Sequence, residues 1–220
     1  FWLKPSRLRR RPRPPARARG AAPLGGMGIL CCAQQELADD GSPGQVDVKQ
    51  GNIPDAEEEI IIHQCNCIQQ KPAAGIEGLI FAKWPTADVY RERRTKGRPP
   101  DRPGSVSVHG RVVNLYAQFC PGVPLAGASE IGFSEYEEEL ALLPAGTADT
   151  REDRLNWFVE CLRELPGVLP GGVQAVALPK NIGCGLAGGV WETYHAAIQH
   201  FARKNRRLRV VIYELKGTDS

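Results

Sequence analysis

Four glycines gather in one nine-residue segment, residues 181–189, whose place in the chain suits anion binding. The segment (NIGCGLAGG) follows an apolar stretch that ends at Leu178 and precedes a helical pattern that begins near Val190. Glycine lets the backbone approach a ligand and turn its N–H groups toward it, and the helix N-terminus adds positive potential. We therefore expect a phosphate or pyrophosphate here. A tight strand-to-helix turn would use the same residues, so the segment alone leaves both interpretations open.

A second segment, residues 73–78 (AAGIEG), also lies between an apolar strand and a helix. Two such loops could clamp the two sides of one diphosphate. Neither loop fits the GxGxxG or P-loop pattern, which disfavours a dinucleotide-binding Rossmann domain and an NTPase. The polar strand end at residues 63–67 (HQCNC) would present alternate side chains into the same crevice.

Strands and helices alternate through most of the chain, which predicts an α/β fold with a mostly parallel sheet covered by helices on both faces. In such a sheet, ligands bind beyond the carboxyl ends of the strands. Apolar runs and alternation predict strands at residues 46–49, 59–67, 106–108, 112–116, 173–178 and 208–214. Helical spacing predicts helices at residues 76–83, 87–95, 151–165 and 190–205, with loops at 121–134 and 143–150.

Composition divides the chain into three parts: a basic, proline-rich tail at residues 1–44, a globular domain at 45–216 and a short C-terminal tail at 217–220. We expect the first tail to be disordered. The first 26 residues hold eight basic residues and no acid, which leaves 20 basic against 25 acidic residues in the remainder. The domain is therefore mildly acidic, and we expect no nucleic acid to bind it.

Seven cysteines, an odd number, favour a reducing compartment over a disulfide framework, so we expect a cytoplasmic or nuclear protein. The spacing of His63, Cys65 and Cys67 does not fit the usual structural zinc patterns, and neither a metal nor a cofactor is predicted. No run approaches the roughly eighteen apolar residues that a membrane-spanning helix needs. We expect Cys184 to be a small packing residue rather than a nucleophile.

The sequence MGILCC begins at Met27, the single methionine of the chain. If translation starts there, Gly28 could be myristoylated and Cys31 or Cys32 palmitoylated, which would attach the protein to a membrane. A linker without function is the favoured alternative, and a transit peptide is a third. A membrane partner is expected only in the acylated case.

The order of these motifs resembles the macrodomain family: GNI, HQCNC, AGIEGLIFAKWPTADVY, VVNLYAQ, ALPKNIGCGLAGGVW and a final VVIYEL, spread over residues 46–214. The chain is most similar to ADP-ribose 1''-phosphate phosphatases of the yeast type and to terminal ADP-ribose protein glycohydrolases. The resemblance implies a three-layer α/β/α fold with a mostly parallel mixed sheet. It also implies a monomer that binds ADP-ribose, its derivatives or ADP-ribosylated proteins.

The resemblance also implies a set of binding residues. Asn52, with Ile53, matches the adenine contact but replaces an aspartate, and Asn66 matches the amide beside the terminal ribose. Phe119 would stack near the ligand. Two diphosphate loops complete the expected set: Gly75, Ile76 and Gly78 in the first, and Gly183, Cys184, Gly185, Leu186, Ala187 and Gly188 in the second.

Two residues are candidates for catalysis by the same resemblance. His63 could act as acid or base near neutral pH, although a histidine on a buried strand is more often a packed core residue. Glu77 could orient or deprotonate a water, or serve only as a favourable partner of a helix N-terminus. The glycohydrolases have an aspartate at Ala187 and a reactive lysine that Lys71 does not match, which disfavours a lysine-linked mechanism.

Three functions stay open from the sequence. One is hydrolysis of ADP-ribose 1''-phosphate or of ADP-ribosylated protein, which would need His63 or Glu77. The second is a non-catalytic reader of ADP-ribosylated proteins, which the missing carboxylate at Ala187 favours. The third is a membrane-tethered scaffold with a vestigial pocket.

Overall fold

The computed structural model describes residues 46–125 and 136–215, except the side chains of Glu137 and Glu138. The chain divides into two units, residues 1–30 and 31–220, and all described residues belong to the second. The predicted N-terminal tail, the MGILCC motif, most of the predicted 121–134 loop and the C-terminal tail lie outside the described residues.

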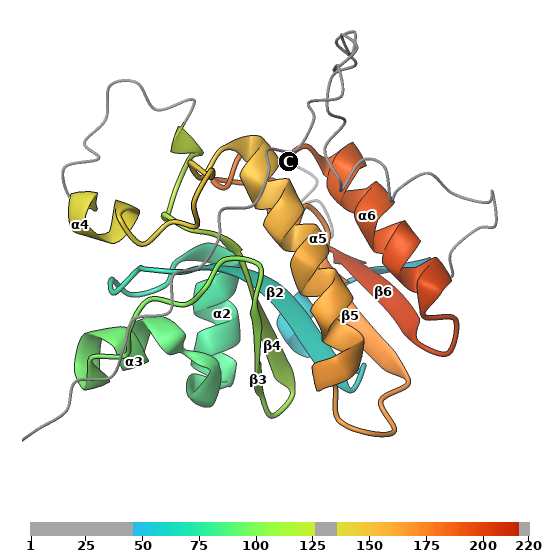
Figure 1. Cartoon of the computed structure of the whole chain (residues 1–220). Helices are drawn as coiled ribbons and strands as arrows, with labels where there is room; N and C mark the ends of the chain where they lie inside the picture. The colour runs from blue at the N-terminus through green and yellow to red at the C-terminus, as the bar shows by residue number, and fades with distance from the viewer. Residues whose placement is uncertain (1–45, 126–135, 216–220) are drawn as a thin grey trace, which may run out of the picture. The chain divides into compact units, whose positions relative to one another are not determined.

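Six strands form one mixed sheet in the order β1-β6-β5-β2-β4-β3 (Figure 1). All neighbouring strands are parallel except β3, which pairs antiparallel with β4. Three central strands are buried along their whole length, as strands covered on both faces must be. The strands are β1 (Val46–Gln50), β2 (Ile60–Asn66), β3 (Val106–His109), β4 (Val112–Gln118), β5 (Ala175–Pro179) and β6 (Arg209–Glu214).

Helices cover both faces of this sheet. Helices α5 and α6 pack against each other and lie in front of the sheet in Figure 1. On the other face, the α2 side chain Phe81 meets His63 of β2 edge-on. The helices are α2 (Gly75–Lys83), α3 (Val89–Lys96), α4 (Glu137–Leu140), α5 (Arg151–Val168) and α6 (Trp191–Lys204), with 3-10 turns η1 (Ile53–Asp55) and η2 (Pro85–Ala87).

Local sequence explains where the longest helix begins. Thr150 precedes α5 and accepts a hydrogen bond from the backbone N–H of Asp153, while the Asp153 carboxylate accepts one from the Thr150 N–H. This capping box satisfies two of the free donors at the helix start. None of the helices in the described part of the chain is long and apolar enough to cross a membrane.

The sheet confirms the predicted fold class, an α/β fold with a mostly parallel mixed sheet and helices on both faces. Each predicted strand and each of the four predicted helices has its counterpart, with ends that differ by a few residues. The short helix α4 was not predicted, because its four residues, EEEL, are too few to show a helical period.

Candidate functional site

A cavity of about 570 Å³ opens at the carboxyl ends of β2, β4 and β5. This is where ligands bind in open parallel sheets. The loop before α2 and the loop before α6 form its two sides, as the sequence predicts. Nine of the predicted site residues line it: His63, Asn66, Gly75, Ile76, Glu77, Gly183, Gly185, Leu186 and Ala187.

A smaller compartment of about 210 Å³ adjoins this cavity, and Asn52 and Ile53 line it. The Asn52 side chain makes no capping hydrogen bond to η1. The two compartments share Ile76 and the stretch from Pro179 to Asn181. Together they form an elongated cleft, and the loop glycines Gly75, Gly183 and Gly185 line its larger compartment. Three predicted binding residues, Gly78, Cys184 and Gly188, do not line either compartment.

The first loop is open. Gly75 begins α2 with φ of 58°, a conformation that favours glycine, and a side chain there would contact nothing within 4 Å. Ala74 precedes the helix and supplies no side-chain cap. The first N–H groups of α2 therefore have no capping side chain and lie beside the cavity, where an anion could accept from them.

The second loop is closely packed. Its backbone folds on itself, since the Gly189 N–H donates to the Gly183 carbonyl at 2.9 Å and the Gly188 N–H donates to the Gly185 carbonyl at 3.0 Å. A Cβ atom at Gly183 would lie 2.4 Å from the Tyr194 ring. Leu186 is 81% exposed at the rim of the cavity. The glycines here give room to neighbouring side chains as well as to a ligand.

A buried ion pair that the sequence analysis missed holds this second loop. Arg154 of α5 is fully buried, pairs with Asp149 and donates to the carbonyls of Ala187 and Gly122. Asp149 in turn accepts from the backbone N–H groups that follow β4. The helical pattern contained the signal, because position 154 shares a face with the buried Phe158.

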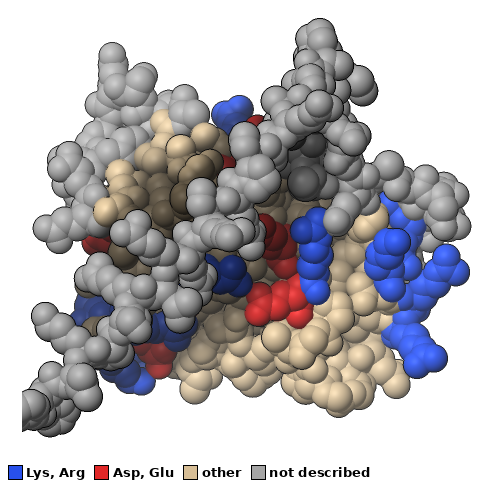
Figure 2. Space-filling model, in the orientation of Figure 1, with Lys and Arg blue, Asp and Glu red and all other residues tan. Residues whose placement is uncertain are grey.

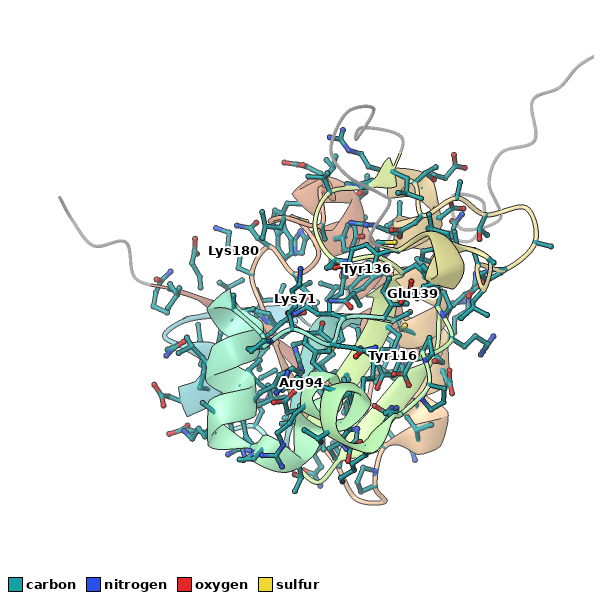
Figure 3. The ribbon with its side chains drawn as sticks, turned by 90° about the vertical axis from the view of Figure 1, so that its left-hand side faces the viewer. Lys71, Arg94, Tyr116, Tyr136, Glu139 and Lys180 are labelled. Carbon is teal, nitrogen blue, oxygen red and sulfur yellow. The ribbon has the colours of Figure 1, made fainter. Side chains whose placement is uncertain are left out.

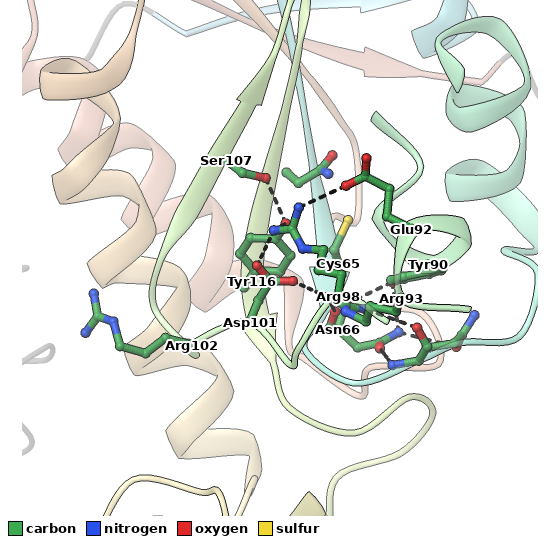
Figure 4. A network of polar contacts seen from close by, with 12 residues as sticks. Cys65, Asn66, Tyr90, Glu92, Arg93, Arg98, Asp101, Arg102, Ser107 and Tyr116 are labelled. Carbon is green, nitrogen blue, oxygen red and sulfur yellow. Dashed lines mark hydrogen bonds and ion pairs between the residues drawn. The ribbon is translucent and has the colours of Figure 1, made fainter. Parts of the chain in front are cut away.

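A second missed residue, Tyr90 of α3, joins the predicted site residues Asn66 and Glu77, and Figure 4 shows its contact with Asn66. Its hydroxyl accepts from the Asn66 backbone N–H at 2.9 Å and from the Asn66 side-chain amide at 2.8 Å. It also lies 3.0 Å from Glu77 Oε1. Because both lone pairs are used by donors, the one hydroxyl proton of Tyr90 must point at Glu77. No pattern in the sequence indicates this contact.

Glu77 stands at the N-terminus of α2 and faces the cavity. Burial raises the pKa of Glu77 to about 7, against the Tyr90 hydrogen bond and the nearby Arg93 charge, which lower it. Among the described residues, only Tyr90 hydrogen-bonds to its carboxylate. The second oxygen is therefore available to a water or a ligand.

His63 lies at the inner wall of the cavity with no exposed surface. Its Nε2 is 2.7 Å from Asn114 Oδ1, and the Asn114 amide nitrogen donates to the Ala87 carbonyl. Asn114 Oδ1 must therefore accept, which places the proton of the ring on Nε2 and leaves a lone pair on Nδ1. Burial lowers the pKa of His63 to about 4, so the ring is neutral. A catalytic role for His63 stays a prediction, and its burial favours the alternative that it is a packed core residue.

Arg93 fixes the strand end that carries Asn66. Its guanidinium donates to the carbonyls of Asn66 and Gln69 and pairs with Asp101 at 2.5 Å (Figure 4). Arg98 also pairs with Asp101. These contacts hold the polar end of β2 against α3, so Asn66 reaches the cavity on a rigid support.

Positive charge accompanies the cleft. Lys180 lines both compartments and pairs with Glu214, which lowers the pKa of that carboxylate. Lys71 lines the larger compartment, and Figure 3 labels both lysines. An anionic ligand in the cleft would therefore meet two ammonium groups as well as the N-terminus of α2.

A third hollow, of about 680 Å³, lies at the opposite end of the sheet, beside the segments that lead into β5 and β6. Four basic residues line it, Arg203, Lys204, Arg206 and Arg207, and Figure 2 shows Lys and Arg side chains gathered on that side, over the end of α6. It is larger than either compartment of the cleft, but neither an acid nor a histidine lines it. The cleft is therefore the candidate site.

One predicted contact is wrong. Phe119 is 1% exposed and belongs to the hydrophobic core, so it cannot stack on a ligand. Its backbone N–H donates to Asp149 Oδ1 at 3.0 Å, which holds this residue in place directly after β4.

Comparisons with solved structures find similar folds. A protein of unknown function from Bacteroides thetaiotaomicron is 22% identical, with a TM-score of 0.55 over 77% of this chain and 98% of that one. Another structure of a protein from that organism is 20% identical, with a TM-score of 0.50 over 76% of this chain and 98% of that one. The macrodomain of Mycobacterium tuberculosis DarG is also similar in fold, at 16% identity and a TM-score of 0.48 over 77% and 97%. No family model and no curated protein matches the sequence.

Proposed function

We propose that the chain binds ADP-ribose, or a close derivative, in the elongated cleft. The observation that supports this proposal is that two compartments meet between the N-terminus of α2 and the glycine loop before α6. A diphosphate at that junction would accept from backbone N–H groups on both sides. The resemblance of the ordered motifs to macrodomains independently suggests the same ligand.

The two compartments offer different polar groups, and these groups match the two different ends of ADP-ribose. The smaller one presents the Asn52 amide beside the Tyr213 ring and suits adenine. The larger one presents Asn66, Glu77 and Gln64, whose buried Oε1 has no hydrogen-bond partner among the described residues. These acceptors suit the hydroxyl groups of the terminal ribose.

Calorimetric titration of the full chain with ADP-ribose tests this proposal. We expect Asn52→Ala to weaken binding at least about tenfold, since a ligand amino group would lose its acceptor. Asn52→Asp is the matched variant and should bind at least as tightly as the natural chain, because a carboxylate accepts the same hydrogen bond. Folded protein that does not bind ADP-ribose would overturn the proposal.

We further propose that the bound derivative is hydrolysed at the terminal ribose, where Glu77 and Asn66 lie. Glu77 would hold the attacking water on its second carboxylate oxygen. The assay follows phosphate release from ADP-ribose 1''-phosphate and ADP-ribose release from a modified protein. Loss of turnover in Glu77→Gln, with ADP-ribose affinity retained, supports hydrolysis.

A non-catalytic reader of ADP-ribosylated proteins is the second candidate function, and one observation favours it. Ala187 lines the cavity where the glycohydrolases carry a carboxylate, and its carbonyl is occupied by Arg154. The position therefore supports the loop and offers no acid. Tight binding of ADP-ribose with no release from either substrate would favour the reader.

A further inference from the structure

Three side chains that commonly bind transition metals meet at the cleft, where His63 and Glu77 line the cavity and Cys65 is buried behind them. His63 and Cys65 are two positions apart on β2 and so face the same side of the sheet. Glu77 reaches them from the first turn of α2. Their ligand atoms all lie within 4.8 Å of one another, and the described residues hold no second group of this kind.

The spacing within this cluster suits a metal ion. Cys65 Sγ lies 3.8 Å from the ring nitrogens of His63. Because Sγ is equally far from both nitrogens and Asn114 holds the ring, the Cys65 side chain would turn toward Nδ1 to share an ion at usual zinc–nitrogen and zinc–sulfur distances of about 2.1 and 2.3 Å. The nitrogen with the lone pair is Nδ1, because Nε2–H donates to Asn114.

Hydrogen bonds already orient two of the three ligands. Metal-binding histidines usually donate their other N–H to an oxygen acceptor, as His63 does to Asn114 Oδ1 at 2.7 Å. Metal-binding carboxylates are usually hydrogen-bonded too, as Glu77 Oε1 is by Tyr90. The cluster therefore has both the ligand set of a zinc site and the outer contacts that such sites use.

We propose that His63, Cys65 and Glu77 bind one divalent transition-metal ion of the zinc class, with its fourth position toward the cavity. A thiolate and a carboxylate would balance the two positive charges in this buried place. Three protein ligands and one open position are the pattern of catalytic zinc sites. A water or a ligand oxygen would take the open position. Only the identity of the ligand beside the ion rests on the proposed function. If that ligand is ADP-ribose, Glu77 would act on the water through the cation that it binds.

The sequence could not predict this site, because its third ligand comes from another element. His63 and Cys65 lie one residue apart, which matches no usual zinc spacing, and Glu77 falls in a loop-to-helix segment that was assigned to phosphate. The parallel sheet brings α2 back across β2, and only then do the three meet.

Metal content and cobalt spectroscopy test the proposal on the full chain, purified without a metal-binding tag. We expect about one zinc ion per chain after loading and dialysis. Replacement by Co²⁺ should give visible bands of a tetrahedral ion and a near-ultraviolet band from sulfur-to-cobalt charge transfer. Cys65→Ser should abolish the charge-transfer band, and Glu77→Gln should weaken zinc binding.

Cys161→Ser is the matched control, since Cys161 is equally buried but donates to the Ser105 carbonyl under α5. Its cobalt spectrum should equal that of the natural chain. Tyr90→Phe should weaken zinc binding by roughly tenfold, as loss of outer contacts does. Folded protein that retains no zinc, or a charge-transfer band that survives Cys65→Ser, would overturn the site.

The failure of this site and the failure of the proposed ligand can be told apart. ADP-ribose is titrated into the chain before and after removal of metal with a chelator. Binding of ADP-ribose by protein that shows no cobalt spectrum overturns the metal site alone. A cobalt spectrum that depends on Cys65, in protein that does not bind ADP-ribose, supports the metal site and overturns the proposed function.

Discussion

The two glycine loops of the cleft look alike in sequence but differ in structure. In the first, Gly75 has open space around it and the loop leads directly into α2. In the second, Cβ atoms at Gly183, Gly188 and Gly189 would each meet a neighbour at 2.7 Å or less. Arg154 also ties the second loop to the core. The first loop uses glycine for backbone conformation, and the second uses it for close packing as well, since Gly183 and Gly188 also have positive φ.

This difference assigns the two loops different parts in binding. A packed loop holds its backbone N–H groups in place before a ligand arrives, so it loses little entropy on binding. An open loop can adjust to its ligand at a greater entropic cost. Substitutions at Arg154 and at single glycines test the packing and the conformation of the two loops separately.

The largest effect is expected from Arg154→Met, which removes the support of the second loop. Asp149 would be left as a buried carboxylate without its partner, and such losses cost about 3–5 kcal/mol. Unfolding in urea measures this loss as a decrease in the free energy of unfolding. Arg163→Met, at an exposed position on the same helix, is the control. A loss below about 1 kcal/mol, within the range of surface substitutions, would mean that Arg154 does not hold the loop.

Gly189→Ala should have the next largest effect. Its Cβ would lie 2.5 Å from the Gly183 carbonyl oxygen and 2.6 Å from the Tyr194 ring, and such overpacking costs about 1–3 kcal/mol. Urea unfolding measures the loss. Gly171→Ala, where nothing lies within 4 Å, serves as the control. Equal stability of the two variants would contradict the packing described for the second loop.

Gly75→Ala should cost less, about 1 kcal/mol, because only the left-handed conformation opposes it. Thermal unfolding detects a change of this size. Gly75→Asn should cost less still, since asparagine tolerates this conformation better than alanine. If alanine and asparagine destabilise equally, the cost does not come from φ and the first loop is not as open as described.

Gly185→Ala should leave stability nearly unchanged, within about 0.5 kcal/mol, since its Cβ meets nothing and its φ is not left-handed. The added methyl group would enter the cleft, so ADP-ribose affinity should fall at least about tenfold. Calorimetry of the folded variant measures this. Unchanged affinity would place the diphosphate away from the second loop.

Much of the fold could be predicted from the sequence for a physical reason. Strands covered on both faces, such as β2 and β5, need continuous apolar runs, and few other structures do. Helices α5 and α6 bury one face, so their apolar residues recur at helical spacing. The two loops were predictable because strand-to-helix junctions rich in glycine mark the ligand-binding edge of such sheets.

The rest depends on contacts between distant segments. Tyr90 is 24 positions from Asn66, and Arg154 is 33 from Ala187, so no local pattern relates them. Phe119 was misplaced for a related reason. The strand end alone does not say which way its next side chain turns, and here two backbone bonds to Asp149 decide it.

The pairing of β1 has a consequence for how the chain folds. Among the described strands, β1 lies at the edge of the sheet and pairs only with β6, joining Gln50 to Glu214 across 164 positions of sequence. During synthesis, β1 must wait unpaired until nearly all of the described chain has left the ribosome. Such long-range parallel pairing slows folding and leaves apolar surface exposed meanwhile. Folding should therefore finish with the closure of β1 onto β6, at the same edge where Asn52 enters the cleft.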